Sequence, residues 1–190
     1  MSNTSRSSGR TLMMCLCAMF TALIAIGAFI KIPVPVVPFT LQYEFTMLAG
    51  LLLGKKYGTI SVVLYVVLGL AGLPIFTQGG GLWYVTVPSF GYLIGFIPGT
   101  FVTGLIAHKN ENPSFKRILA ANFSGLAIVY ALGMAYVYMI KNFYLEGDGI
   151  TFWPLLLNCF LLVVPGDFVL CLVAAAAAKR IIPATAKYRR

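Results

Sequence analysis

Acidic residues and histidine are scarce in this chain. Its 190 residues include five Asp and Glu, one His, and 14 Lys and Arg. The single histidine, His108, lies at an expected helix end with no second metal ligand and no nucleophile partner, so neither a His/Glu metal cluster nor a Ser–His–Asp set can be assembled. Segment 50–56 has the wrong spacing for a phosphate-binding loop and no Ser or Thr after its lysines. The sequence therefore argues against an enzyme, and we expect this chain to bind no nucleotide, cofactor or metal.

The four cysteines do not have the spacing of metal ligands. Cys15 and Cys17 are two residues apart on an expected helix and so point to different faces, while Cys159 and Cys171 lie in other apolar segments. Small buried thiols are the interpretation that we favour.

Charged residues are missing from long stretches, and 59% of the chain is hydrophobic. No Asp, Glu, Lys or Arg occurs between Tyr57 and Ala107. Such runs are typical of membrane-spanning helices, which need about 20 residues each. The first run, 11–30, follows two arginines and so resembles a signal peptide, but it is too long for one. We expect a single all-α integral membrane domain over residues 1–190, with tails at about 1–10 and 183–190.

Six membrane-spanning helices would use nearly the whole chain. Prolines at 33, 35 and 38 predict an extended loop after the first span, because proline fixes φ and removes a donor. The glycines 79–81 predict a flexible loop after the third span. Residues 154–162 are expected to form a short interfacial or re-entrant helix before the last span, and one long span kinked at Pro165 is the alternative. The expected spans are 11–30, 40–54, 57–74, 89–107, 118–140 and 165–182.

Gaps rich in Lys and Arg alternate along the chain with gaps that have almost none. All of the 14 Lys and Arg except Lys31 and Lys141 fall at the two termini or in the second and fourth gaps. The positive-inside bias then places both termini in the cytoplasm. Because the cations flank spans, the net charge of +9 indicates contact with membrane lipid and gives no reason to expect nucleic acid.

Two of the acids, Glu44 and Asp167, lie in or beside apolar segments on the expected outer side. An ionisable group there usually faces the bundle interior or a water-filled cavity, although a capping or interfacial role is the alternative for each. Polar and aromatic residues on the same side suggest a pocket for a small amphiphilic ligand. An aromatic belt at the headgroup level is the alternative for Trp83. The nearby residues are Gln42, Tyr43, Gln78, Trp83, Tyr84, Tyr92 and Asn158.

Small residues form a stripe on the first span. Ala18 and Ala22 are four residues apart and therefore share one face of the helix. Such a stripe lets another helix approach closely, within the bundle or from a partner.

Several short motifs occur in a fixed order along the chain. They are 38–42 (PFTLQ), 48–54 (LAGLLLG), 68–76 (LGLAGLPIF), the glycines 79–81, 91–96 (GYLIGF) and 165–167 (PGD). The ordered set, over roughly residues 11–180, resembles the BioY family, the biotin-specific S components of energy-coupling factor (ECF) transporters.

The resemblance implies a six-helix bundle of the ECF S-component type in a prokaryotic cell membrane. It implies that biotin binds near the outer surface, under the loops after the first and third spans. Transport would then need an EcfT-type coupling subunit and two EcfA-type ATPases, which bind the ATP. Ala18 and Ala22 resemble the alanine motif by which S components dock on the coupling subunit.

The same resemblance suggests roles for individual residues. Gln42 is expected to pair with the ureido group of biotin. Asp167 is expected either to accept from the ureido group or to organise donors around the carboxylate. Tyr43, Trp83 and Tyr92 are expected to wall the rings. Leu93 and Leu170 occupy positions that are often basic in the family. Three partners for the carboxylate of biotin therefore stay open: Lys31, the N–H groups of 79–81, or a hydroxyl. The full expected binding set is Gln42, Tyr43, Gly80, Trp83, Tyr84, Tyr92, Asn158 and Asp167.

The sequence is also compatible with two other functions. One is an S component for another vitamin, such as thiamine or riboflavin. The other is a stand-alone ion-coupled carrier that uses Glu44 or Asp167 as a proton or cation site.

Overall fold

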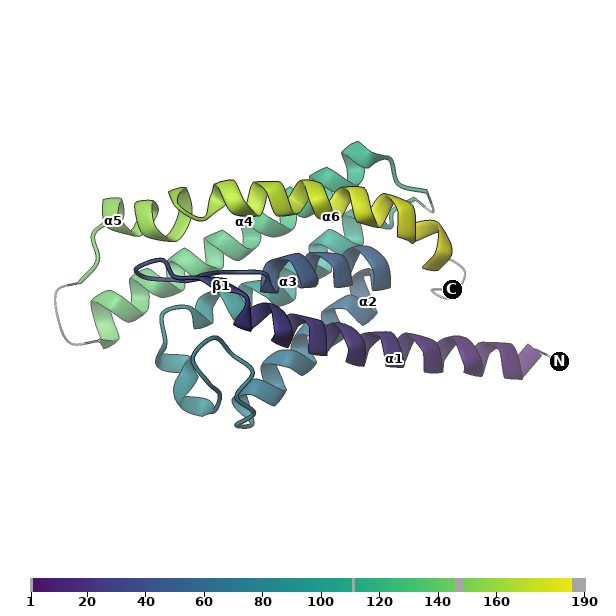
Figure 1. Cartoon of the computed structure of the whole chain (residues 1–190), viewed down its shortest axis with the longest axis horizontal. Coiled ribbons are helices and arrows are strands. Elements are labelled where there is room, and N and C mark those ends of the chain that lie inside the picture. The colour runs from purple at the N-terminus through teal and green to yellow at the C-terminus, as the bar shows by residue number, and fades with distance from the viewer. Residues whose placement is uncertain (1, 111, 146–148, 186–190) are drawn as a thin grey trace.

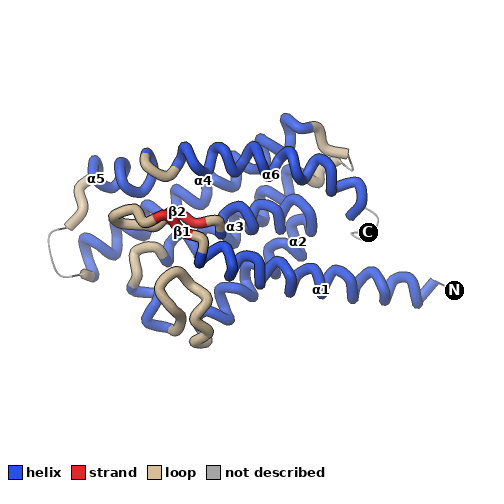
Figure 2. The backbone as a smooth tube through the Cα atoms, viewed as in Figure 1, coloured by secondary structure: helices blue, strands red, loops and turns tan. Residues whose placement is uncertain are grey.

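The computed structural model describes residues 2–110, 112–145 and 149–185, and most of them are helical (Figures 1 and 2). Three of the acids, Glu111, Glu146 and Asp148, lie outside this range, as does the tail 186–190. The long helices are α1 (Ser2–Phe29), α2 (Gln42–Leu70), α3 (Phe90–Ala107), α4 (Phe115–Met139) and α6 (Val164–Thr185). The shorter elements are β1 (Lys31–Ile32), β2 (Phe39–Thr40), η1 (Leu82–Thr86), η2 (Ile140–Tyr144), α5 (Phe152–Leu156) and η3 (Leu157–Leu161).

Helix α2 is folded in two at Gly54. This residue has φ 81° and ψ 177°, a left-handed backbone that glycine adopts without strain. The two halves pack side by side: the side chain of Gln42 hydrogen-bonds the hydroxyl of Tyr65. A Cβ added to Gly58 would lie 2.6 Å from the backbone oxygen of Ala49. The break falls where the sequence predicts the end of the second span.

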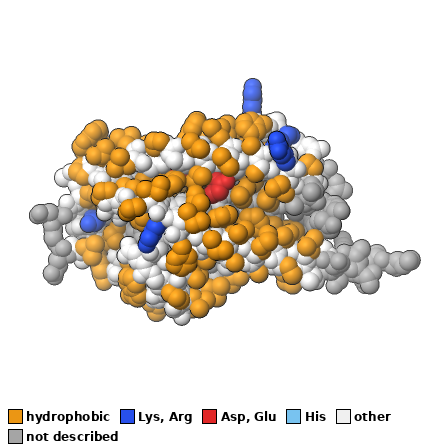
Figure 3. Space-filling model, viewed as in Figure 1, with side chains coloured by type: hydrophobic (Ala, Val, Ile, Leu, Met, Phe, Trp, Pro, Cys, Tyr) orange, Lys and Arg blue, Asp and Glu red, His pale blue; other side chains and the backbone are white. Residues whose placement is uncertain are grey.

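Five helical segments are long and apolar enough to cross a membrane: Gly9–Phe29, Gln42–Leu70, Phe90–Ala107, Phe115–Tyr144 and Phe152–Pro183. The folded α2 contains the second and third predicted spans in one element. Hydrophobic side chains cover most of the face shown in Figure 3, as expected for a surface in contact with lipid.

Some predicted boundaries were wrong by a few residues. The second span begins at Gln42, since Phe39 and Thr40 pair with Lys31 and Ile32 in a small antiparallel hairpin. The helical part of the third ends at Leu70, short of the predicted 74, and the chain turns at Gly72 with φ 110°. The fifth span begins earlier, at Phe115, because Ser114 caps the helix by accepting from the backbone N–H of Arg117.

Residues 152–161 are helical, and a turn at 162–163 separates them from α6. In Figure 1 this segment and α6 follow one another along the top of the bundle. Phe152–Pro183 also qualifies as one long candidate span. The arrangement is closer to the alternative of one kinked span than to a helix lying apart from the last crossing.

Glycine allows α3 and α4 to pack closely. A Cβ added to Gly95 would lie 3.0 Å from the Cα of Val129, and one added to Gly99 would lie 3.1 Å from the oxygen of Gly125. A Cβ on Gly133 would overlap the ring of Tyr92, at 2.6 Å. Contact between backbones is a common way for helices to associate in membranes. It fixes the position of Tyr92 between the two helices.

The connecting segments gather at two ends of the bundle (Figure 1). The β1–β2 hairpin, the loop 71–89 and α5 lie at one end, on the left of the view. The start of α1, the end of α6 and the turn of α2 lie at the other. The cations of the α2 turn, Lys55 and Lys56, are thus at the end that carries both termini. The candidate site lies at the opposite end.

Candidate ligand-binding site

A cavity lies between the β1–β2 hairpin and the helix ends beneath it. It holds about 560 Å³ of space, part of which is open to solvent. Sites for small molecules are typically concave and mostly apolar, with a few polar groups. The lining residues are Val37, Pro38, Phe39, Thr40, Gln42, Tyr43, Thr77, Ser89, Tyr92, Leu93, Phe96, Val129, Tyr130, Cys159, Val163 and Asp167.

Asp167 supplies the one formal charge among these lining residues. It lies in the first turn of α6 and is 6% exposed. The hydroxyl of Tyr130, on α4, donates to its Oδ2 at 2.5 Å. The Oδ1 atom has no donor within the described part of the chain. The adjacent Gly166 makes room for the ring of Phe39, which an added Cβ would approach to 2.8 Å. A buried carboxylate thus keeps one acceptor oxygen for a ligand.

Gln42 places an amide at the first turn of α2. Its Nε2 donates to the hydroxyl of Tyr65, which in turn donates to the backbone oxygen of Ile75 at 3.1 Å. Thr40 donates to its Oε1 at 3.3 Å. These bonds tie the hairpin, α2 and the loop 71–89 together and hold the amide against the cavity. One N–H of the amide remains available to a ligand.

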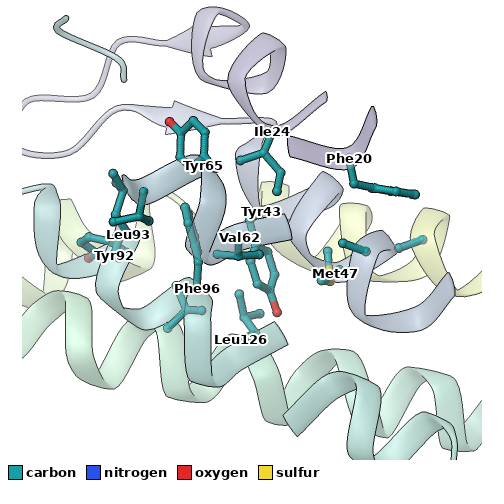
Figure 4. Close-up of a cluster of buried hydrophobic side chains, with 14 of the residues drawn as sticks. Phe20, Ile24, Tyr43, Met47, Val62, Tyr65, Tyr92, Leu93, Phe96 and Leu126 are labelled. Atoms are coloured by element: carbon teal, nitrogen blue, oxygen red, sulfur yellow. The ribbon is translucent and has the colours of Figure 1, made fainter. Parts of the chain in front are cut away.

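Aromatic rings form much of the wall. Tyr43 stacks on Phe96 with ring centres 6.2 Å apart, and its hydroxyl donates to the backbone oxygen of Asn122 at 2.9 Å. Tyr92 meets Tyr130 edge to face at 6.0 Å and donates to the oxygen of Cys159 at 3.0 Å. Figure 4 shows Tyr43 and Phe96 together where α2 and α3 face α4. These contacts orient rings from three helices around one apolar space.

The loop 71–89 closes one side of the cavity through Thr77 and Ser89. Both hydroxyls contact that of Tyr84, at 2.7 Å and 3.4 Å. Tyr84 is itself fully buried behind them and packs on Phe76 with ring centres 4.5 Å apart. Its role in this structure is to hold the loop, and it does not line the cavity.

Four of the eight predicted binding residues line the cavity: Gln42, Tyr43, Tyr92 and Asp167. The other four are Gly80, Trp83, Tyr84 and Asn158. Trp83 is 52% exposed and its indole donates to the oxygen of Gly80 at 2.8 Å. Asn158 donates to the oxygen of Pro154, one turn back in its own helix, at 2.8 Å.

The sequence analysis did not select Tyr130, Thr77, Ser89, Thr40 or Phe96. Tyr130 carried a usable signal, because a tyrosine in the middle of an apolar span needs a partner for its hydroxyl. Thr40, Thr77 and Ser89 carried none, since hydroxyl residues are common in loops. Their place in the site follows from how the two loops fold over the helix ends.

The remaining candidates lie away from the cavity. Glu44 does not line it, although the side chain is 8% exposed and its Oε2 is buried without a hydrogen-bond partner. Ala18 and Ala22 are both exposed on α1. A different face of α1 packs on α2, where Thr21 donates to the oxygen of Ser61 at 3.0 Å. The alanine stripe is therefore open to a neighbour.

Among the described residues, no group of three or more His, Cys, Asp or Glu is placed to hold a metal ion. The arrangement of the cavity suits the binding of a compact ring system with hydrogen-bonding groups. Asp167 can accept, Gln42 can donate, and the aromatic rings can enclose apolar atoms.

The sequence matches the BioY family over residues 1–187. The chain belongs to the BioY family. A Lysinibacillus sphaericus protein named "Probable biotin transporter BioY" is 45% identical over 171 residues, which cover 90% of this chain and 87% of that protein. The "Biotin transporter BioY" of Thermotoga maritima is 51% identical over 128 residues, covering 67% of this chain and 72% of that protein.

A solved structure shares the fold of this BioY family member. It is the crystal structure of the S-component for biotin from an ECF-type ABC transporter, with a TM-score of 0.81. The two chains are 29% identical, and the superposition covers 95% of this chain and 94% of the other. Both the sequence and the fold therefore place the chain in a family of transporter components.

Proposed function

We propose that this chain is a high-affinity biotin-binding S component. It captures biotin at the outer membrane surface and delivers it inward together with an ATP-driven ECF module. The observation that carries the proposal is the cavity in a BioY family member, which brings the carboxylate of Asp167 and the amide of Gln42 to one aromatic-walled space. Relatives with the same family assignment are named biotin transporters.

The chemistry of biotin complements this cavity. Its ureido group has two N–H donors and one oxygen, and its thioether ring is apolar. Asp167 accepts from a ureido N–H through Oδ1, while the free N–H of Gln42 donates to the ureido oxygen. Tyr43, Tyr92 and Phe96 surround the rings. The valeryl chain then runs toward the hairpin, away from the charge of Asp167.

We further propose that the protein is one membrane domain with six crossings, in the cell membrane of a prokaryote, and that both termini lie in the cytoplasm. The two halves of α2 would provide the second and third crossings. Its first half, 42–53, is about 18 Å long as a helix, so the hairpin and the lipid headgroups must accommodate the remaining thickness. The basic gaps at the end that carries the termini support this orientation.

The exposed Ala18 and Ala22 form the docking face for an EcfT-type coupling subunit. Two EcfA-type ATPases bind and hydrolyse the ATP, so this chain needs neither a catalytic site nor a cofactor. Small exposed side chains on α1 support close helix contact there.

The most direct functional test is a calorimetric titration of the detergent-solubilised chain with biotin, riboflavin and thiamine. We expect one biotin per chain to bind, and no heat of binding from the other two vitamins at the same concentrations. Binding of riboflavin or thiamine in place of biotin would favour an S component for that vitamin. Uptake of biotin against a gradient by the chain alone in liposomes would favour the ion-coupled carrier.

A further inference from the structure

Lys31 lies at the mouth of the cavity, and it is one of the three partners left open above for the carboxylate of biotin. It is exposed on β1, directly opposite Thr40 of β2. Its Nζ donates to the backbone oxygen of Thr77 at 2.9 Å. Both of these neighbours, Thr40 and Thr77, line the cavity. The ammonium group therefore lies between the hairpin and the loop 71–89, beside two parts of the cavity rim.

The cavity lining carries a negative charge and no positive charge. Asp167 is the one formally charged residue of the lining, and it is buried. A ligand carboxylate beside it would meet a like charge, which costs about 4 kcal/mol at 4 Å and an effective dielectric constant of 20. A carboxylate-bearing ligand whose ring contacts Asp167 must therefore point its acid group toward the mouth.

The mouth offers few other donors for an anion. In the glycine run, the N–H of Gly79 donates to the oxygen of Phe76 at 3.2 Å. The N–H of Gly81 donates to the oxygen of Gly69 at 2.7 Å. Both groups are committed to the fold of the loop. Lys141 has no hydrogen bond to a lining residue within the described ranges.

We propose that Lys31 binds the carboxylate of the ligand. The assignment rests on the proposed function, since it takes biotin as the ligand. An ammonium group has three donors, and Thr77 uses one of them, so two remain for a carboxylate without loss of the existing bond. The bound ligand then connects Asp167 at the base of the cavity to Lys31 at its mouth. The same contact adds a second tie between the hairpin and the loop 71–89.

The test compares biotin with its neutral amide, in which the carboxylate is replaced by a carboxamide. We measure the dissociation constants of both ligands for wild type, Lys31→Gln, Lys31→Arg and Lys141→Gln. Lys31→Gln should weaken biotin about 10-fold, the lower range for a charge-assisted bond at an exposed site. It should change the affinity for the amide less than about twofold, because that ligand has no charge to lose.

Two controls accompany this comparison. Lys31→Arg should retain biotin affinity, since it keeps the charge. Lys141→Gln removes one positive charge at another position on the expected outer side. It should leave the affinities for biotin and for the amide unchanged. The affinity of wild type for biotin should also fall as salt is raised, more steeply than that of Lys31→Gln.

The possible failures are distinguishable. If wild type binds no biotin, the proposed function itself fails. If wild type binds biotin but Lys31→Gln leaves its affinity unchanged, the carboxylate is bound elsewhere and the assignment is overturned. Equal weakening of biotin and the amide also overturns it, because Lys31 would then act only as a structural tie to Thr77. If Lys141→Gln weakens the binding of biotin but not of the amide, Lys141 is the residue that binds the carboxylate, and the assignment to Lys31 is overturned.

Discussion

At the scale of single residues, Asp167 is the polar centre of the cavity. It is buried at the start of α6 and shares one hydrogen bond with Tyr130. Asp167→Asn keeps the shape and removes the charge, so the loss of a charge-assisted bond should weaken biotin binding by about 1.5–3 kcal/mol, or roughly 10- to 150-fold. Calorimetric titration measures this loss, and the thermal unfolding of the variant checks its fold. Unchanged affinity in a folded Asp167→Asn protein would assign the residue to helix capping alone.

Glu44 provides the matched control for that substitution. It is also a buried acid near the start of a helix, but it does not line the cavity. Glu44→Gln should change biotin affinity by less than about twofold. Removal of an unpaired buried charge should leave the protein at least as stable as wild type in thermal unfolding. A large loss of binding would show that Glu44 takes part, as an ion-coupled mechanism requires.

At the scale of helices, the exposed stripe on α1 should serve a partner and leave the ligand site untouched. Ala18→Trp and Ala22→Trp add bulk where two helices would touch, and close packing tolerates little overfilling. Biotin binding by the solitary chain should persist, while uptake with the complete ECF module should fall. Ile94→Trp, at an exposed position of α3, is the control and should affect neither.

Loss of binding together with uptake would contradict this role for the stripe. It would mean that the two alanines support the packing of α1 inside the chain. Both alanines are exposed, and the contact of α1 with α2 uses other residues such as Thr21, so we expect binding to persist and uptake to fall.

The helices were predictable because the membrane requires long apolar runs, and the break of α2 because Gly54 is followed by two lysines. The sequence did not predict how each helix is rotated about its own axis. In lipid, both faces of a span can be apolar, so hydropathy does not reveal that Tyr130 faces the cavity. The hairpin was also missed. Its strands have two residues each, and a proline-rich segment carries no periodic pattern that would show pairing of Lys31 with Thr40.

At the scale of the whole molecule, the charge distribution predicts which end faces the cytoplasm. In a cysteine-free background, a cysteine at Lys109 should react with a membrane-impermeant reagent only from inside, and a cysteine at Tyr144 only from outside. Both positions are exposed, and they lie at opposite ends of α4 and its neighbouring loop. Labelling of both from the same side would contradict the six-crossing arrangement.

A structure of the purified chain with bound biotin would show whether biotin occupies the cavity beneath the hairpin. We expect the ureido group within hydrogen-bond distance of Asp167 and Gln42, with the bicyclic rings against Tyr43 and Phe96. Density for biotin outside this cavity, for instance against Trp83 and Asn158, would contradict it. So would an empty cavity at a biotin concentration that saturates the protein in solution.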